Sequence, residues 1–489
     1  SDSSIIPSFL SQFVHFYHQR RDGTLRRQSF TSTMTSNPPS RYPPSNEELR
    51  RFYIGKDIGD VPKPAVVLDV AIIKRHCQAL LQTMKQLGVG FRAHIKTHKT
   101  PQIARLQVGT ESSDANFVVS TVAEMETLLP LLQELQAQNR RISVLYGIPL
   151  VPSQVPRLAA LAHKLRTTDH TLPISVMIDH PDQLTYLSQF HEIAGLPAGV
   201  FLKVDTGYHR AGVPPDRLNK NGLLEKVLEA ERIGHARLIG VYSHSSLSYA
   251  ATSPDEAISY LKTEIEGCGT ALRQHASLLP DRPLVISVGA TPQVVSSGSL
   301  LQEESLTPDA KALRDLLRDP SAQIGGRVKV ELHAGVYTLL DMQQLATNAQ
   351  RAGSFEEEIA ISVVAEMCSA YNEGERDKPE ALVAAGTLAL GREPCKSYPG
   401  WAVVGNWRLQ NDRGGSRLIV ERISQEHGII AWEGGHGPAI PVRVGQAVRL
   451  YPNHACVTGS LYGWYLVVDS SEDGEGSRVV DVWARTTGW

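Results

Sequence analysis

The stretch FRAHIKTHKT, residues 91–100, places several basic side chains at the end of an apolar run with the composition of a buried strand. Lys96, His98 and Lys99 fall within four positions, and His94 lies just upstream. A lysine at the end of a buried strand loses hydration, and cationic neighbours such as His98 and Lys99 lower the pKa of its ammonium group further. The resulting neutral amine is a nucleophile that can capture an aldehyde. The alternative is that both lysines extend from the strand end toward solvent.

Two glycine-containing turns follow strand-like runs and are suited to bind phosphate. SVGATP (287–292) combines Gly289 with small and hydroxyl residues, and HAGVY (333–337) follows the next run. Glycine lets backbone N–H groups approach a phosphate closely, although glycine is common in turns of every kind. Pyridoxal phosphate is an aldehyde that carries a phosphate, so a reactive lysine together with these turns indicates a site for this cofactor.

A third candidate site lies near the C-terminus. His454 and Cys456 are two positions apart in a run that looks like a strand, so we expect both side chains on one face. Imidazole and thiolate together are ligands that suit Zn²⁺. The alternative is that both residues belong to a hydrophobic core.

These residues are spread over alternating strand-like and helix-like segments. Eight short β-branched runs are separated by stretches of helical composition. The runs are AHIK (93–96), ANFVVST (115–121), ISVLY (142–146), ISVMID (174–179), GVFLKVD (199–205), LIGVYSH (238–244), LVISV (284–288) and VKVELH (328–333). This pattern predicts a (β/α)8 barrel, with a doubly wound open sheet as the alternative. In barrels the chemistry lies at the C-terminal strand ends, where Lys96, Asp205, His244 and His333 fall.

The segments outside the eight runs differ from the barrel region in composition and periodicity. From about residue 355, strand-like runs are broken by Gly, Pro and Asn without a long amphipathic helix, which predicts an all-β domain over 356–489. The barrel is then assigned to residues 77–355. The run PAVVLDV (64–70) precedes the first barrel strand and is left outside the barrel.

Residues 1–50 form an N-terminal extension. Before Glu47 the only acidic residues are Asp2 and Asp22, and arginines, serines and threonines surround apolar positions that could share a helical face, as in a mitochondrial presequence. The alternative is a disordered tail, which the composition of NPPSRYPPSNEE (37–48) favours. We therefore expect a cytoplasmic protein, or a mitochondrial one if residues 1–50 act as a presequence.

Composition excludes several kinds of partner. Forty-nine Lys and Arg against fifty-one Asp and Glu give a net charge of −2, which provides no basic field for nucleic acid. No apolar run reaches the roughly 18 residues that span a bilayer. Five scattered cysteines without a CxxC pair indicate reduced thiols, and they are Cys77, Cys268, Cys368, Cys395 and Cys456. The expected partner is a small-molecule substrate.

The motifs resemble, in order, those of a known enzyme family. FRAHIKTHK, DTGYHRAGV (205–213), SVGATP, ELHAGVY and YPNHACVT are similar to the eukaryotic D-serine dehydratase and D-threonine aldolase family of pyridoxal-phosphate enzymes. The resemblance runs from about residue 60 to the C-terminus. It implies the alanine racemase fold (fold type III), in which a (β/α)8 barrel precedes a β domain, and a homodimer. It also implies that the first strand belongs to the β domain, which assigns residues 51–76 to that domain.

The resemblance implies roles for individual residues. Lys96 would hold pyridoxal 5'-phosphate covalently, Arg210 would reach the ring oxygen of the cofactor, and Tyr208 would lie beside the ring. Further contacts to the ring or phosphate would come from Ser248, Tyr249, Gly289, Ala290, Thr291 and Tyr337. In SHSSLSY (243–249) the family leads us to expect glycine and often histidine where this chain has Ser246 and Leu247. Any role of that histidine is therefore expected to be absent or moved.

The residues at the metal position distinguish the dehydratases of this family from the aldolases. The resemblance places a metal at His454 and Cys456, where the aldolases usually carry aspartate in second place. A thiolate favours Zn²⁺, whereas a carboxylate favours Mn²⁺ or Mg²⁺. The cysteine therefore indicates a dehydratase that depends on pyridoxal phosphate and zinc and converts D-serine to pyruvate and ammonia.

The expected mechanism uses both sites. Lys96 removes the α-proton while the cofactor takes up charge, and the zinc helps hydroxide to leave. Three alternatives stay open. They are retro-aldol cleavage of D-β-hydroxy amino acids such as D-threonine, a non-catalytic pyridoxal-phosphate protein, and a racemase, which would need a second base that the sequence does not identify.

Overall fold

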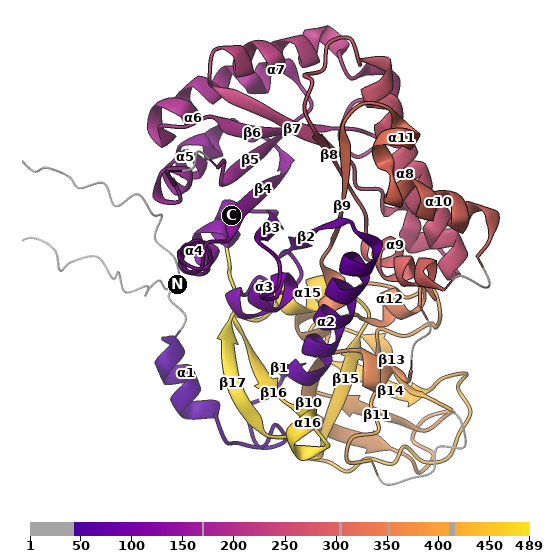
Figure 1. Ribbon diagram of the computed structural model, residues 1–489. Helices are drawn as coiled ribbons and strands as arrows, with labels where there is room; N and C mark the ends of the chain where they lie inside the picture. Colours follow the sequence, from indigo (N-terminus) through magenta and orange to yellow (C-terminus); the bar gives the residue numbers. More distant parts are fainter. Residues whose placement is uncertain (1–43, 169–170, 303–305, 351–352, 410–415) are drawn as a thin grey trace, which may run out of the picture. The chain divides into compact units, whose positions relative to one another are not determined.

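Eight parallel strands close into a barrel in the computed structural model of the protein (Figure 1). In order around the barrel they are β2 (Gly90–His94), β3 (Asp114–Val119), β4 (Arg141–Pro149), β5 (Ile174–Ile178), β6 (Ala198–Lys203), β7 (Ala236–Tyr242), β8 (Leu284–Val288) and β9 (Val328–Ala334). The barrel closes where β9 pairs with β2. Each strand overlaps one of the predicted runs, so the predicted barrel is confirmed and the open sheet is wrong.

The structure describes residues 44–489 apart from 169–170, 303–305, 351–352 and 410–415. Residues 1–43, which hold most of the proposed N-terminal extension, lie outside the described residues. Helix α1 (Asn46–Tyr53) begins within the proposed extension, because Ser45 and Glu48 form a reciprocal N-terminal cap. The proposed boundary at residue 50 therefore falls inside a helix.

Helices connect the barrel strands and surround the barrel in Figure 1. They are α2 (Val70–Leu87), α3 (Pro101–Val108), α4 (Val122–Ala137), α5 (Val155–Lys164), α6 (Leu187–Ala194), α7 (Leu223–Arg232), α8 (Pro254–Gln274), α9 (Thr291–Ser296), α10 (Pro308–Arg318) and α11 (Pro320–Ile324). Helix α2 begins at Val70 because the side chain of Asp69 caps it. The proposed boundary at residue 76 therefore cuts α2.

A second sheet of nine strands follows the barrel in sequence. Its order is β11–β14–β13–β12–β15–β10–β1–β16–β17. The bounds are β1 (Ala65–Asp69), β10 (Ile361–Tyr371), β11 (Glu380–Val383), β12 (Ala402–Val404), β13 (Leu418–Ile423), β14 (Gly428–Trp432), β15 (Ala447–Pro452), β16 (Trp464–Val468) and β17 (Val479–Ala484). Strand β1 pairs antiparallel with β10 and parallel with β16, so the run before the barrel does belong to this sheet.

Short helices interrupt the second half of the chain. They are α12 (Met342–Leu345), α13 (Phe355–Glu358), α14 (Thr387–Leu390), α15 (Ala455–Ser460) and α16 (Ser470–Asp473). Helix α15 lies in the run around His454 and Cys456 that the sequence predicts to be a strand, so that prediction is wrong. Among these short helices, α15 bears on the candidate site because it carries Cys456.

One hydrophobic core joins the barrel to the nine-stranded sheet. The cluster that contains the barrel residues Ile95 and Val288 also contains Ile361, Tyr465 and Trp483 from the sheet. Close to the barrel mouth, the backbone N–H of Thr486 and its hydroxyl both donate to the carbonyl of Lys99, at 3.0 Å each. The C-terminal segment is thereby fixed against the loop that carries Lys96.

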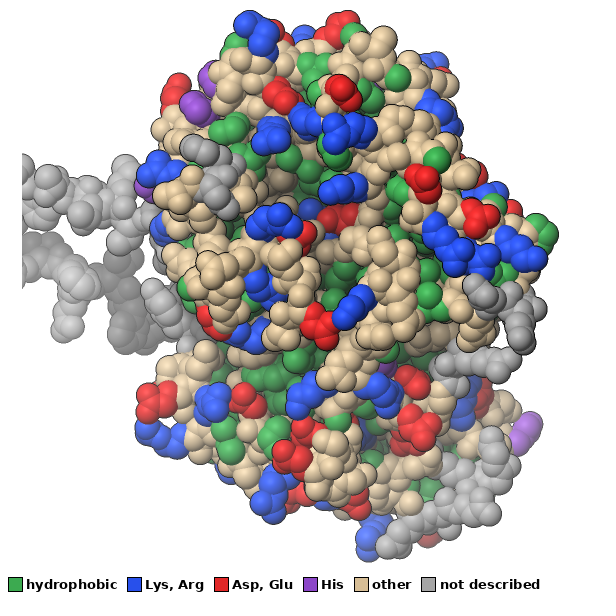
Figure 2. All heavy atoms as spheres, in the orientation of Figure 1, with side chains coloured by type: hydrophobic (Ala, Val, Ile, Leu, Met, Phe, Trp, Pro, Cys, Tyr) green, Lys and Arg blue, Asp and Glu red, His purple; other side chains and the backbone are tan. Residues whose placement is uncertain are grey.

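Charged side chains of both signs are interspersed on the face shown in Figure 2, as the net charge of −2 leads one to expect. All five cysteines are free thiols, as predicted. Among the described residues, no helix is both long and apolar enough to cross a membrane.

Candidate active site

A cavity of about 330 Å³ lies at the C-terminal ends of the barrel strands. Seven of the predicted site residues line it, and they are Lys96, Tyr208, Tyr249, Ala290, Thr291, His454 and Cys456. The remaining lining comes from His94, His244, Ser246, His333, Ala334, Gly335, Val336, Gln343 and Gln344. Loops after several barrel strands therefore meet residues of α12 and α15 around one space.

Lys96 lies in the turn after β2, which ends at His94. The predicted cationic neighbours of Lys96 do not act as such. Lys99 has a positive φ of 51° and its Nζ lies 3.0 Å from the carboxylate of Glu124. His98 is fully buried, and burial lowers its pKa to about 3, so its imidazole is neutral. That part of the prediction is wrong, because His98 is neutral and the charge of Lys99 is compensated by Glu124.

Neutral imidazoles lie next to Lys96 instead. Burial, followed by the positive charge of Lys96, holds the pKa values of His94 and His244 well below the ordinary 6.5. The Nδ1 of His244 lies 2.7 Å from the carbonyl oxygen of Gly289, so this nitrogen is the donor. His244 belongs to the SHSSLSY segment, for which the resemblance implied that a histidine role is absent or moved. A histidine of this segment does reach the cavity.

Arg210 lies beside the cavity rather than in its lining. It borders a small adjoining pocket with Tyr208, and its guanidinium lies 5.4 Å from the centre of the Tyr208 ring. The loop that carries both residues is shaped by Asp205, whose Oδ1 accepts hydrogen bonds from the backbone N–H groups of Gly207 and His209. This loop therefore has a defined conformation at the mouth of the barrel.

The two glycine-containing turns lie against each other. Gly289 has a φ of +134°, and a Cβ at this position would come within 2.7 Å of the His333 carbonyl oxygen. A Cβ at Gly335 would come within 2.8 Å of the His94 carbonyl oxygen. The backbone N–H of Tyr337 donates to Thr291 Oγ1 at 3.2 Å. Only glycine permits this close approach of the two turns.

Two other predicted residues are buried near these turns without lining the cavity. Ser248 is fully buried in the 3-10 helix η5 (Ser246–Ala250), and its Oγ has no partner among the described residues. The ring of Tyr337 packs edge to face on Phe91 at 5.9 Å. The structure thus brings the backbone of Tyr337 toward Thr291 and directs its ring into the core.

His454 and Cys456 meet in a helical turn, not in a strand. Strand β15 ends at Pro452, His454 is the N-cap of α15, and Cys456 lies in its first turn. The predicted strand is wrong, because Asp341 accepts a hydrogen bond from the backbone N–H of Ala455 at 2.8 Å and so stabilises the start of the helix. The two side chains nevertheless lie close enough to shift each other's pKa, and they line the same cavity.

The electrostatics of this pair favour a thiolate. Burial raises the pKa of the Cys456 thiol, but its interactions with His454, Thr97 and Lys96 outweigh burial, so this pKa is lowered overall. Burial lowers the pKa of His454, while Cys456 and the nearby carboxylates raise it to about 9. Thr97 Oγ1 lies 3.2 Å from Cys456 Sγ and links the pair to the Lys96 loop. Among the described residues no group of three or more metal-ligating side chains is present.

Several lining residues were missed in the sequence. The sequence placed His244 and His333 at predicted C-terminal strand ends and His94 just upstream of Lys96, but it assigned none of them a role in the site. Gln343 and Gln344 come from α12, a helix of four residues that carries no recognisable motif. Their position depends on the packing of α12 against the barrel mouth.

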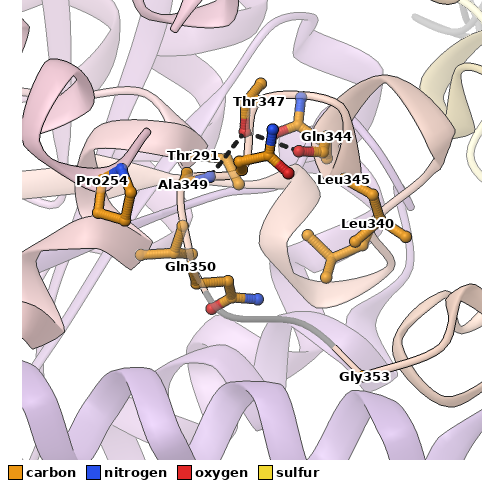
Figure 3. A pocket seen from close by; sticks show the side chains of 11 residues that line it. Pro254, Thr291, Leu340, Gln344, Leu345, Thr347, Ala349, Gln350 and Gly353 are labelled. Atoms are coloured by element: carbon orange, nitrogen blue, oxygen red, sulfur yellow. Dashed lines mark hydrogen bonds between the residues drawn. The ribbon is translucent and has the colours of Figure 1, made fainter. Parts of the chain in front are cut away.

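A larger cavity of about 610 Å³ adjoins the first (Figure 3). Thr291 and Gln344 line both cavities. Figure 3 shows the hydroxyl of Thr347 hydrogen bonded to the Gln344 carbonyl at 2.7 Å and to the Ala349 N–H at 3.3 Å. No ionisable side chain is among the described residues that line it, so the smaller cavity is the one equipped for chemistry.

Comparison with known proteins relates both parts of the chain to characterised families. The family described as "Alanine racemase, N-terminal domain" matches residues 68–303, and "Putative serine dehydratase domain" matches residues 360–468. A D-serine dehydratase of Schizosaccharomyces pombe is 33% identical over 448 residues, which cover 91% of this chain and 96% of that protein. A D-serine dehydratase of Saccharomyces cerevisiae is 29% identical, covering 89% of this chain and 98% of that protein.

A solved structure supports the same relationship. D-threo-3-hydroxyaspartate dehydratase from Delftia sp. HT23 is 25% identical, with a TM-score of 0.67 over 89% of this chain and all of that chain. An alanine racemase from Bacillus anthracis has a TM-score of 0.52 at 11% identity, which shows a likeness of fold and no more. The match to the Schizosaccharomyces pombe protein covers 96% of that protein, and the barrel and the nine-stranded sheet agree with it. This chain therefore belongs to the D-serine dehydratase family, with a barrel of the alanine racemase type.

Proposed function

We propose that this protein is a pyridoxal-phosphate-dependent D-serine dehydratase that converts D-serine to pyruvate and ammonia. The observation that carries the proposal is the meeting of Lys96 with the His454–Cys456 pair around one cavity, joined through Thr97. The relatives named D-serine dehydratase match the chain over nearly their full length, which supports the same assignment.

The cavity fits pyridoxal phosphate. It has a lysine in its lining, two close-packed glycine turns with backbone groups nearby, and the buried, unpartnered Oγ of Ser248 beside it. An unpartnered buried hydroxyl costs free energy unless a ligand satisfies it. Lys96 would hold the cofactor, and Ser248, Gly289, Ala290 and Thr291 would surround its phosphate. When bound, the cofactor supplies an electron sink for charge that develops at the substrate Cα.

Lys96 is the group that we assign to proton transfer. It is the only amine in the described lining, and the neutral imidazoles of His94 and His244 lie next to it. Its Nζ accepts the proton from the substrate Cα. A single base reaches only one face of the substrate, so the reaction is confined to one enantiomer. Burial raises the pKa of Tyr249, which keeps this lining phenol protonated and unsuited to act as a second base.

We assign a Zn²⁺ ion to His454 and Cys456. An imidazole and a thiolate are donors that suit zinc, and both side chains face the cavity that contains Lys96. With two protein ligands the ion would keep open positions, where it would supply Lewis acidity to substrate oxygens. A structure of a D-threo-3-hydroxyaspartate dehydratase with a cysteine-to-alanine mutation is described as being in the metal-free form, which supports a metal in that protein.

The test is product analysis with purified protein. D-serine is expected to give pyruvate and ammonia in equal amounts, and L-serine is expected to give neither. Glycine and acetaldehyde from D-threonine without pyruvate from D-serine would instead establish the aldolase, and interconversion of the serine enantiomers would establish a racemase. The homodimer and the cytoplasmic location stay predictions from the sequence.

A further inference from the structure

A chain of hydrogen bonds runs through the barrel interior and ends at His333. Arg92, which is 2% exposed, donates to the carboxylate of Glu331 through Nε at 2.7 Å and Nη2 at 3.3 Å. The hydroxyl of Ser287 donates to Glu331 Oε1 at 2.8 Å. The same Ser287 Oγ lies 3.2 Å from Nδ1 of His333. All of these side chains are buried, so water does not compete for the hydrogen bonds.

This chain determines which nitrogen of His333 carries the proton. Glu331 is paired with Arg92, so it is a carboxylate and can only accept hydrogen bonds. Ser287 has one hydroxyl proton, which points to Glu331, and it therefore offers only a lone pair to His333. Nδ1 of His333 must be the donor in that contact. In a neutral imidazole the other nitrogen, Nε2, is then an acceptor.

The charge and orientation of the His333 ring agree with this assignment. Burial, followed by the neighbouring His244 and His94, holds the pKa of His333 well below 6.5, so the ring is neutral. The ring stacks on Tyr242 with centroids 4.3 Å apart and an interplanar angle of 2°. Stacking and the Ser287 contact together fix the ring in one orientation.

The acceptor nitrogen of His333 lacks a partner. His333 lines the cavity and is fully buried, and its Nε2 is not hydrogen bonded to any described residue. Nδ1 faces Ser287 in the barrel interior, so Nε2 lies on the other edge of the ring. A buried, unpaired acceptor is costly to the protein, and a ligand that donates a hydrogen bond there would remove the cost.

We propose that Nε2 of His333 accepts a hydrogen bond from the ring nitrogen of the cofactor and holds that nitrogen in its protonated form. The inference rests on the proposed function, because it takes pyridoxal phosphate as the ligand. The phosphate and the ring oxygen of this cofactor present lone pairs, which a bare imidazole nitrogen repels. The ring nitrogen is the cofactor atom that can carry an N–H toward His333. Ser287, Glu331 and Arg92 act as positioning residues.

A protonated ring nitrogen strengthens the cofactor as an electron sink. The tautomer of His333 is therefore a determinant of reactivity that lies in the barrel strands and not in the loops. An arginine at position 333 would have the opposite effect, because its guanidinium has donors and no acceptor.

The test measures the protonation of the ring nitrogen directly. Full-length protein is loaded with pyridoxal phosphate labelled with ¹⁵N in the ring, and its NMR shift is recorded without substrate. Wild type is expected to show a protonated ring nitrogen, and His333→Arg an unprotonated one. A wild-type signal of an unprotonated nitrogen, or a protonated signal that persists unchanged in His333→Arg, would overturn the proposal.

Milder variants keep the test decisive if His333→Arg does not fold. Ser287→Ala removes the partner of Nδ1, and it is expected to shift the ring-nitrogen signal toward the unprotonated form and to weaken cofactor binding about tenfold, the effect of one lost hydrogen bond. Ser143→Ala is the matched control, because Ser143 Oγ contacts the same network at Arg92, at 3.3 Å, and is not a partner of His333. It is expected to match wild type. A signal in Ser287→Ala identical to the control would contradict the positioning role.

Histidine-labelled protein separates this proposal from the proposed function. In full-length protein carrying ¹⁵N-histidine, one neutral ring with the proton on Nδ1 is expected to disappear in His333→Gln. If the protein does not take up pyridoxal phosphate, the proposed function fails whatever the tautomer. If the cofactor is bound and the resonance lost in His333→Gln is that of a ring protonated on Nε2, only the inference about His333 fails.

Discussion

At the scale of single residues, the site depends on groups whose protonation is determined by burial. Lys96, His454 and Cys456 could be found in the sequence because motifs mark them. The neutral state of His94 and His244 could not, since it results from complete desolvation beside Lys96. For the same reason His98 was assigned a cationic role that its buried position excludes.

Thr97 provides a test of the proposed metal site at this scale. Its hydroxyl contacts Cys456 Sγ at 3.2 Å, and its side chain is fully buried. Partners of metal ligands typically contribute about 10–100-fold to metal affinity. Thr97→Val is therefore expected to weaken zinc binding by that factor, measured by competition with a chelator of known affinity.

The control for Thr97→Val is Thr97→Ser, which keeps the hydroxyl and is expected to retain most of the affinity. Equal zinc affinity in the valine variant and wild type would show that the contact to Cys456 does not support a metal. Elemental analysis of the purified proteins gives an independent reading of the same quantity.

At the scale of helices and strands, periodicity was sufficient to predict the barrel but not the turn that carries His454 and Cys456. The eight barrel strands are short, buried and separated by amphipathic helices, so the pattern identifies each of them. Helix α15 was mistaken for a strand because its start depends on Asp341, which is 114 positions away in sequence. A local pattern does not contain such a contact.

The turn after β8 gives a prediction about these elements. Gly289→Ala would place a Cβ within 2.7 Å of the His333 carbonyl at a φ of +134°. Strain and overpacking of this kind cost about 1–3 kcal/mol. We expect a decrease of that size in the free energy of unfolding, measured by chemical denaturation, together with weaker cofactor binding.

Gly298→Ala is the control in the same region, because a Cβ there meets nothing nearer than Thr83 Oγ1 at 3.9 Å. It is expected to change the free energy of unfolding little. If Gly289→Ala is as stable as Gly298→Ala, the two turns are not packed as closely as described.

At the scale of the whole molecule, the barrel and the nine-stranded sheet share one core, and the C-terminal segment contacts the Lys96 loop. The sequence indicated a barrel followed by a β domain. The domain boundaries predicted at residues 50 and 76 nevertheless fall within helices. These helices begin at the side-chain caps Ser45 and Asp69, upstream of the changes in composition from which the boundaries were predicted.

Buried histidines make the stability of the molecule depend on pH. Burial lowers the pKa of His98 to about 3, below the ordinary 6.5, so the unfolded chain binds a proton here at higher pH than the folded protein does. Stability is therefore lost as the pH falls from about 6.5 toward 3, by up to about 1.4 kcal/mol per pH unit for one such group.

Replacement of His98 should reduce that dependence. In His98→Gln the free energy of unfolding, measured in denaturant at several pH values, is expected to fall less steeply below pH 6.5 than in wild type. His436→Gln, at an exposed position, is expected to leave the slope unchanged. A slope in His98→Gln equal to that of wild type would mean that His98 is not a buried neutral group.

The proposed function requires that Lys96 holds the cofactor, in the cavity between the barrel strand ends and helix α15. Borohydride reduction of the purified, cofactor-loaded protein fixes pyridoxal phosphate to the lysine that holds it, and peptide mass spectrometry then locates the label. Because Lys96 lines the cavity and Lys99 is paired with Glu124, the label is expected on Lys96 and to be absent from Lys96→Ala. A label on Lys99 or on any other lysine, or no label in protein that releases pyruvate from D-serine, would contradict the account.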